Sequence, residues 1–342
     1  MHTMPPMTAT DTHAFCRKLQ QRSQAMAAAR SFFAKQGFWE VDTPMLSAAA
    51  VPDPHIDPVA AQLHETIGKP GNRYFLHTSP ELFLKRVLAA GAQRVYQLSH
   101  VFRDGELDRL HRIEFTMLEW YRLHSSMQQI IHDCQQLFVQ CKQQMQPYAV
   151  SCYDPIQWHQ PIEQLTMQQL WQQHAGIDLE AALRQMQQGN QLALVQAVLQ
   201  AGHALRDNAS FEDAFTHMML TCIEPHIGQQ RPCAVTHWPA QMACLAQLCP
   251  ENSLFAQRFE IYAGGVELAN GFVELTDPTL QRQRFEQDNI KRQRMGKPIL
   301  PLDEAFLRDL QHLPPCVGVA VGFDRLLMLQ NGHNTLRDVT VF

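Results

Sequence analysis

The sequence predicts an α+β fold in which an antiparallel sheet is flanked by helices. Strand-like segments lie toward both ends of the 342-residue chain, and mainly helical sequence fills the region from about 125 to 230. Adjacent glycines, Gly264 and Gly265, separate two strand-like segments, as is typical of a hairpin. Length alone leaves one or two domains open. We expect a single domain over residues 1–342 that carries the helical region as an insertion.

The first elements follow from periodicity. Apolar residues at helical spacing predict a helix over residues 11–35, which Gly37 ends. Residues 38–43 then alternate like a strand, and Pro44 ends it because proline cannot donate to a ladder. Farther along, Ser79-Pro80-Glu81 predicts the start of a helix that ends near Gly91, with Ser79 as the N-cap.

The remaining elements are predicted in the same way. Residues 94–102 and 114–122 resemble two strands, and the polar segment 104–113 predicts that a long loop joins them as an antiparallel pair. Two capping boxes, at 126–129 and 166–169, precede helical sequence. Further strands are expected at 233–237, 258–262, from Val266 onward and at 317–321, the last followed by a helix to about Leu329.

Composition excludes several classes of protein. The chain has no run of about 20 apolar residues and no signal-peptide pattern, so we expect a cytoplasmic protein. Its nine cysteines are scattered without zinc or redox spacing, and we expect reduced thiols. The net charge is −5 and the basic residues are dispersed, which favours a protein or small-molecule partner over nucleic acid.

The segment 114–121 places an acid on an apolar strand face. The period of two puts Phe115, Met117, Glu119 and Tyr121 on one side. Because burying a lone carboxylate is costly, either this face is open or a cation occupies it. A half-exposed edge strand is the alternative interpretation.

The segment 260–274 is rich in acids. With a two-residue turn at 264–265, Tyr262 pairs with Glu267, and Glu260 and Glu267 become diagonal neighbours on one face. Two such carboxylates suit Mg²⁺, although a solvated hairpin explains either acid alone. Asn270 and Glu274 have the other parity, so a shared site requires a bulge, for which 269–271 is a reasonable place. A second tight turn at 270–271 is the alternative.

The segment 318–325 runs from a glycine-spaced strand into the start of a helix. Backbone amides at a helix start attract anions, and Arg325 suits a phosphate. The pattern matches neither a P-loop nor a dinucleotide-binding loop. Ordinary glycine packing is the alternative interpretation.

Together these segments resemble the three signature motifs of class II aminoacyl-tRNA synthetases, in the right order. Pro44 stands at the motif 1 proline, residues 102–121 resemble motif 2 and residues 318–325 resemble motif 3. Within that class, the segments 114–121 and 267–277 are similar to the lysine branch. The resemblance covers about residues 14–342 and implies the class II catalytic fold, ATP as substrate, Mg²⁺ and a homodimer built through motif 1.

Motif 1 begins near residue 40, so we expect no N-terminal anticodon-binding domain. The chain resembles the short paralogues of lysyl-tRNA synthetase that attach (R)-beta-lysine to a lysine of elongation factor P. Ala320 supports this, since the synthetases generally have glycine there. The resemblance implies elongation factor P as protein acceptor, lysine or (R)-beta-lysine as substrate, and neither tRNA nor a membrane as partner.

The resemblance also implies roles for individual residues. Arg103 and Arg325 are the expected catalytic residues, and Glu260 and Glu267 the expected metal ligands. The amino acid is expected to meet Ser79, Glu81, Tyr121, Asn270, Glu274 and Ala320. ATP is expected to meet Arg103, Asp104, Gly105, Glu106, Arg112, Phe115, Glu267, Leu268, Gly322 and Arg325.

Two departures fall in motif 2. The usual Arg-x-Glu is here Arg103-Asp104-Gly105-Glu106, and the usual His-Asn-Pro-Glu is here residues 111–114, His-Arg-Ile-Glu. Either Glu106 or Asp104 takes over the role of the acid, or catalysis is weakened. Three functions therefore stay open: a ligase acting on elongation factor P, a truncated synthetase that charges tRNA or makes a free amide, and a catalytically silent lysine-binding or regulatory paralogue.

Overall fold

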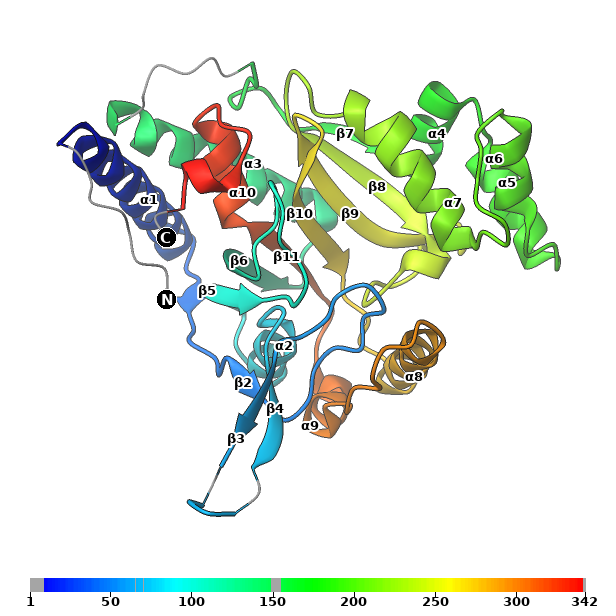
Figure 1. Cartoon of the computed structure of the whole chain (residues 1–342), viewed down its shortest axis with the longest axis horizontal. Helices are drawn as coiled ribbons and strands as arrows, with labels where there is room; N and C mark the ends of the chain where they lie inside the picture. Colours follow the sequence, from blue (N-terminus) through cyan, green and yellow to red (C-terminus); the bar gives the residue numbers. More distant parts are fainter. Residues whose placement is uncertain (1–8, 65, 70, 149–154, 341–342) are drawn as a thin grey trace. The chain divides into compact units, whose positions relative to one another are not determined.

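The computed structural model describes residues 9–64, 66–69, 71–148 and 155–340 (Figure 1). It divides into two compact units, each described here by itself. The first unit comprises Met1–Ser125, Asp133–Asp154 and Thr276–Phe342, and the second comprises Ser126–His132 and Pro155–Leu275. Helix α3 (Met127–Met145) begins in a segment of the second unit and continues in the first.

A row of paired strands organises the first unit. In spatial order it contains β1 (Trp39–Glu40), β5 (Arg94–Phe102), β6 (Glu114–Leu123) and β11 (Cys316–Gly322). β1 is parallel to β5, and the other two pairings are antiparallel. A separate antiparallel sheet contains β2 (Leu46–Ser47), β4 (Asn72–Leu76) and β3 (Ala60–Leu63).

The first unit also contains α-helices, some of which pack against these strands and others against one another. They are α1 (Ala9–Lys35), α2 (Glu81–Ala89), α8 (Pro278–Arg294), α9 (Glu304–Asp309) and α10 (Phe323–Gln330). On α1, the ring of Phe33 stacks on Tyr96 at 4.3 Å and meets Trp120 edge-on at 5.2 Å. Tyr96 and Trp120 are cross-strand partners in β5 and β6, so this aromatic group fixes the helix against the hairpin.

The second unit combines four strands with short helices. β7 (Glu163–Thr166) is parallel to β8 (Cys233–Pro239), and β9 (Phe255–Ala263) is antiparallel to both β8 and β10 (Val266–Val273). The α-helices are α4 (Met167–Ala175), α5 (Leu179–Gln187), α6 (Ala193–Gln200) and α7 (Phe211–Met218). Apolar residues from these helices and from β8 and β9 form one buried cluster around Trp171 and Phe215.

The α+β prediction is confirmed, as are the two strands around the motif 2 loop and their antiparallel pairing. At the predicted hairpin turn, Gly264 and Gly265 have φ of 59° and 74°, the conformation that favours glycine. Thr166 and Gln169 form both halves of a capping box, and Ser126 Oγ accepts from the Gln129 amide.

Three local predictions need correction. The strand expected over residues 38–43 is only Trp39–Glu40, because it borders β5 over two residue pairs. Helix α2 begins at Glu81 with Pro80 as its N-cap, so Ser79 is not the capping residue. The region expected to be mainly helical also contains strand β7, which ends at Thr166, the first residue of the capping box.

Each described cysteine is a free thiol, and Cys152 lies outside the described residues. Over the part of the chain that the structure describes, no helix combines the length and apolar character that crossing a bilayer requires.

Candidate active site

The first group of predicted residues lies on one face of β5, β6 and β11. Antiparallel partners share a face, and Glu119 lies opposite Gln97 on β5 and opposite Ala320 on β11. Tyr121 lies opposite Gly318, and its hydroxyl donates to Glu119 Oε1 at 2.7 Å. Both side chains are buried. The strand register therefore places an acid and a phenol together, beside small residues of β11.

Gln97 is a polar residue of this face that the sequence analysis missed. Its Oε1 accepts from the Thr43 hydroxyl at 2.8 Å. Its Nε2 is buried and, among the described residues, makes no hydrogen bond. A buried donor of this kind indicates a place for an acceptor on a ligand. The alternation of residues along 94–102 shows which residues share a face with Gln97. It identifies Gln97 as a site residue only when the register with β6 is known.

Arg103 follows β5 and is held by two contacts. Its guanidinium lies 5.1 Å from the centre of the Phe115 ring, and its Nη1 lies 3.9 Å from Glu106 Oε1. Gly105 has φ of 77°, so the chain turns there and brings Glu106 back toward Arg103. Asp104 instead donates its backbone amide to Asp57 O at 2.7 Å. Glu106 is thus the acid that neighbours Arg103.

Arg325, in the first turn of α10, reaches the motif 2 loop. Its Nε donates to Leu110 O at 3.2 Å, and its Nη2 lies 2.7 Å from His111 Nε2. The other ring nitrogen of His111 lies 2.9 Å from Asp108 Oδ2. His111 Nδ1–H therefore donates to the Asp108 carboxylate, which leaves Nε2 as the acceptor for Arg325. The hydrogen bond from the Leu110 amide, together with those from the ring and amide of His111, lowers the pKa of Asp108, although burial opposes the shift.

Other predicted residues of the first unit have partners that sequence reasoning did not provide. Glu81 pairs with the buried Lys85 at 2.5 Å, a spacing of four residues on one helix that was visible in the sequence. Arg112 donates to Thr340 Oγ1 at 3.1 Å. Gly322 is the N-cap of α10, and Ser79 Oγ accepts from the Glu81 amide at 3.4 Å.

In the second unit, β9 and β10 carry the predicted acids. Tyr262 pairs with Glu267 as expected, and Asn270 pairs with Glu260. The register shifts between Glu267 and Ala269, so the predicted bulge exists but lies at the buried Leu268 rather than at 269–271. The alternative tight turn at 270–271 is wrong, because both residues belong to β10.

Glu260 is buried within a charged group. Its Oε1 lies 2.5 Å from Arg258 Nη2, and its Oε2 accepts from the Tyr262 hydroxyl at 2.5 Å. Burial, and then the negative charge of Glu267, raise the pKa of Glu260 to about 7. Arg258 also donates to Asn270 Oδ1 at 3.3 Å. The sequence analysis missed Arg258, whose parity along the strand places it on the same face as Glu260.

Glu274 follows β10 and has no exposed surface. Its backbone is held by a short segment of the same unit: Ala246 forms a bridge with it, and Gln247 Nε2 donates to its carbonyl at 2.9 Å. Because a buried carboxylate is costly in an apolar setting, this position suits recognition of a cationic group.

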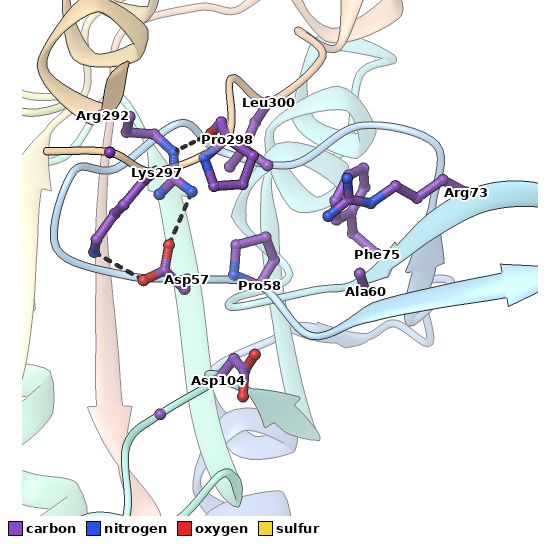
Figure 2. Close-up of a pocket in the computed structure, with 12 residues that line it drawn as sticks. Asp57, Pro58, Ala60, Arg73, Phe75, Asp104, Arg292, Lys297, Pro298 and Leu300 are labelled. Carbon is purple, nitrogen blue, oxygen red and sulfur yellow. Dashed lines mark hydrogen bonds and ion pairs between the residues drawn. The ribbon is translucent and has the colours of Figure 1, made fainter. Parts of the chain in front are cut away.

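A cavity of about 370 Å³ borders the motif 2 loop in the first unit, and Asp104 and Gly105 line part of it. Figure 2 shows Arg292 and Lys297 meeting Asp57 at one side, with Arg73 beside Phe75 at the other. Both cations lie 2.8 Å from the Asp57 carboxylate. Burial alone would raise the pKa of Asp57, but these two partners outweigh it and the pKa lies below its usual value.

The predicted residues thus form two sets. Arg103, Phe115, Tyr121, Ala320, Gly322 and Arg325 belong to the first unit, with residues 79, 81, 104–106 and 112, while Glu260, Glu267, Leu268, Asn270 and Glu274 belong to the second. Contacts join Arg103 to Phe115 and Glu106 in the first unit, and strand pairing joins Glu260 to Asn270 in the second. That all of these residues act in one reaction stays a prediction.

Comparison with known proteins bears directly on this arrangement. The family model for class II tRNA synthetases (D, K and N) matches residues 7–342. The elongation factor P–(R)-beta-lysine ligases of Salmonella paratyphi B and Salmonella schwarzengrund are each 41% identical to this chain over 326 residues. The alignment covers 95% of this chain and 94% of each relative. The chain therefore belongs to the class II tRNA synthetase family, and its α+β fold is the catalytic fold of that family.

Proposed function

We propose that the chain is an ATP-dependent ligase that activates (R)-beta-lysine, or lysine, and transfers it to a lysine side chain of elongation factor P. The observation that carries the proposal is the 41% identity over 95% of the chain to ligases of that name. The two units then serve one catalytic domain, in which residues of about 125–230 are an insertion. We also propose a cytoplasmic location and no tRNA partner.

The first step joins two anions. The amino acid carboxylate attacks the α-phosphorus of ATP, and the bond between that phosphorus and the oxygen bridging to the β-phosphate breaks. Pyrophosphate departs, and the other product is an aminoacyl-adenylate. Arg103 and Arg325 neutralise the charge that develops on the phosphates, and Phe115 stacks on adenine. The contact of Arg103 with both Phe115 and Glu106 supports this, because it positions the guanidinium before ATP binds.

The second step forms an amide. An uncharged lysine amine of the acceptor attacks the adenylate carbonyl, AMP leaves, and the amine gives up one proton to solvent. The side-chain ammonium of the bound amino acid is received by Tyr121 and Glu274, and its other amine by Glu81. Asn270 donates to the carboxylate. Ser79 and Ala320 border the same substrate, while Asp104, Gly105, Arg112, Leu268 and Gly322 border ATP.

Glu260 and Glu267 are the residues that would hold Mg²⁺. The donor set fits, because hard carboxylate oxygens are the usual magnesium ligands and the negative charge of Glu267 disfavours ionisation of Glu260. When bound, the ion supplies positive charge to the phosphates. Arg258 supplies a compensating charge to Glu260 from within the protein.

We further propose a homodimer through motif 1. Apolar side chains around Pro44 are unusually exposed for their type: Trp39 is 64% exposed, Met45 42% and Leu46 39%. Exposed apolar groups of this kind are typical of protein interfaces.

The test is ATP–pyrophosphate exchange with lysine and with (R)-beta-lysine, followed by the mass of purified elongation factor P. We expect exchange with at least one of the two, and a mass increase of one residue on the factor. Glu274→Gln should abolish exchange, whereas Glu163→Gln, at an exposed ion pair with Arg231, should leave it unchanged. Exchange with neither amino acid indicates the silent paralogue. Charging of tRNA without modification of the factor indicates the truncated synthetase.

A further inference from the structure

A group of three potential metal ligands lies in the second unit, apart from the residues of the proposed reaction. A ring nitrogen of His237, Sγ of Cys249 and a carboxylate oxygen of Glu251 all lie within 4.8 Å of one another. His237 Nε2 is 3.7 Å from Glu251 Oε1. Tetrahedral zinc with bonds of about 2.0–2.3 Å separates neighbouring donors by about 3.4–3.6 Å, so small side-chain rotations suffice to bring the three into place.

The backbone at His237 is shaped for this group. The register between β8 and β9 shifts between Thr236 and Trp238, where β9 has two residues, Gln257 and Arg258, opposite the single residue His237. Its φ is 58°, in the left-handed region that side chains rarely adopt. His237 thus lies opposite a bulge of β9, and a side-chain-bearing residue held at such a φ is a candidate for a functional position.

The imidazole is also held in the form that a metal requires. Thr236 Oγ1 donates to Leu165 O at 3.4 Å and lies 2.9 Å from His237 Nδ1, so the hydroxyl oxygen accepts the Nδ1 proton. Nε2, the nitrogen near Glu251, then carries the lone pair. The Thr236 side chain therefore favours the tautomer of His237 in which Nδ1 carries the proton.

The thiol of Cys249 completes the set from a folded loop. Cys249 is 3% exposed, and its amide donates to Phe255 O at 2.8 Å. Glu251, two residues on, is exposed and can rotate toward the other donors. Nitrogen, sulfur and carboxylate oxygen together match zinc, and a hard ion such as Mg²⁺ is disfavoured by the thiol.

We propose that His237, Cys249 and Glu251 bind one Zn²⁺, with water in the fourth position. The thiol loses its proton to solvent when the metal binds. The ion links β8 to the loop before β9 and is distinct from the magnesium of the proposed reaction. Neither the binding nor its test depends on the proposed function.

The experiment titrates the metal-stripped full chain with Co²⁺ and then displaces it with Zn²⁺. We expect one equivalent to give the near-ultraviolet charge-transfer band of a cobalt–thiolate bond, and one equivalent of Zn²⁺ to remove it. Cys249→Ser should abolish the band, and Thr236→Val should weaken binding about 10–100-fold. Cys222→Ser, at a partly buried thiol 3.9 Å from His203 in the same unit, is the matched control and should change nothing.

Absence of the band in the wild type, or an unchanged band in Cys249→Ser, overturns the proposal. If Cys249→Ser does not fold, Glu251→Gln decides, because this side chain is 68% exposed and its substitution leaves the core intact. Added Zn²⁺ should raise the melting temperature of the wild type more than that of Glu251→Gln. Equal shifts count against the site.

Discussion

The two sets of predicted residues differ in the sign of their main charged groups and in how deeply these groups are buried. In the first unit the expected catalytic groups are arginines, and 24% of the Arg103 side chain stays exposed while Phe115 and Glu106 hold it. In the second unit the expected metal ligands are acids, and only 5% of the Glu260 side chain is exposed. A partly exposed cation needs little compensation, whereas a buried carboxylate requires a partner. In the second unit Arg258 is that partner for Glu260. The ionisation of Glu260 therefore depends on Arg258 and on the charge of Glu267.

The largest effect on stability is expected when Arg258, the cationic partner of Glu260, is replaced. Arg258→Met should lower the free energy of unfolding by about 3–5 kcal/mol at pH 8, because it leaves the ionised Glu260 buried without its cation. Urea unfolding measures this. Adding Glu260→Gln to Arg258→Met should recover part of the loss. A double variant as unstable as the sum of the two single variants would show that the pair is not coupled.

The first set is tested by Arg103→Ala. We expect ATP–pyrophosphate exchange to fall about 10²–10³-fold with little change in stability, since the side chain neutralises developing charge and is not part of the core. Arg206→Ala, which removes a 74% exposed arginine from the second unit, is the control and should exchange normally. Equal activity of the two variants would exclude Arg103 from the chemistry.

The coupling between acids predicts a pH effect. The folded-state pKa of Glu260, about 7, exceeds the ordinary value of 4.5. Between these values the unfolded chain loses a proton that the folded chain keeps, so this group's contribution to stability falls as the pH rises from about 4.5 to 7. Glu267→Gln removes one cause of the shift and should make that fall smaller. Unfolding free energies of the wild type and the variant at pH 5, 6, 7 and 8 measure the difference, and parallel profiles would contradict it.

The smallest effect concerns the methyl group opposite Glu119. Ala320→Gly should change the ratio of kcat/KM for lysine over (R)-beta-lysine by about fivefold, because one methyl group in a pocket contributes about 1 kcal/mol to discrimination. Val319→Ala, on the other face of the same strand, controls for strand stability. A ratio that changes equally in both variants would remove Ala320 from specificity.

Local sequence patterns predicted most of the turns and strand pairings that carry the two sets of residues. The hairpin around 104–113, the turn at 264–265 and the pairing of Tyr262 with Glu267 all follow from alternation and turn chemistry. The sheet of β2, β3 and β4 was not predicted, because its strands are short and mostly exposed or half-buried and so lack a clear period. Helix α8 was also not predicted, since few of its residues are apolar and its buried stripe is mostly polar: Gln281, Phe285, Asn289 and Arg292.

Contacts between residues that are distant in the sequence could not be predicted from such local patterns. His111 and Arg325 are 214 positions apart, and their contact depends on how β11 returns beside β6. The bulge at Leu268 was predicted in kind but not in place, because parity requires an extra residue without saying where it is inserted.

The network at Asp57 joins three segments that are far apart in the chain. Its carbonyl accepts a hydrogen bond from the Asp104 amide, and its carboxylate pairs with Arg292, in the last turn of α8, and with Lys297, just beyond that helix. We therefore expect the start of the motif 2 loop to open together with the segments that Asp57 joins to it. In hydrogen exchange, the Asp104 amide should exchange at the same rate as the buried backbone around Leu300, and Asp57→Ala should make both exchange faster.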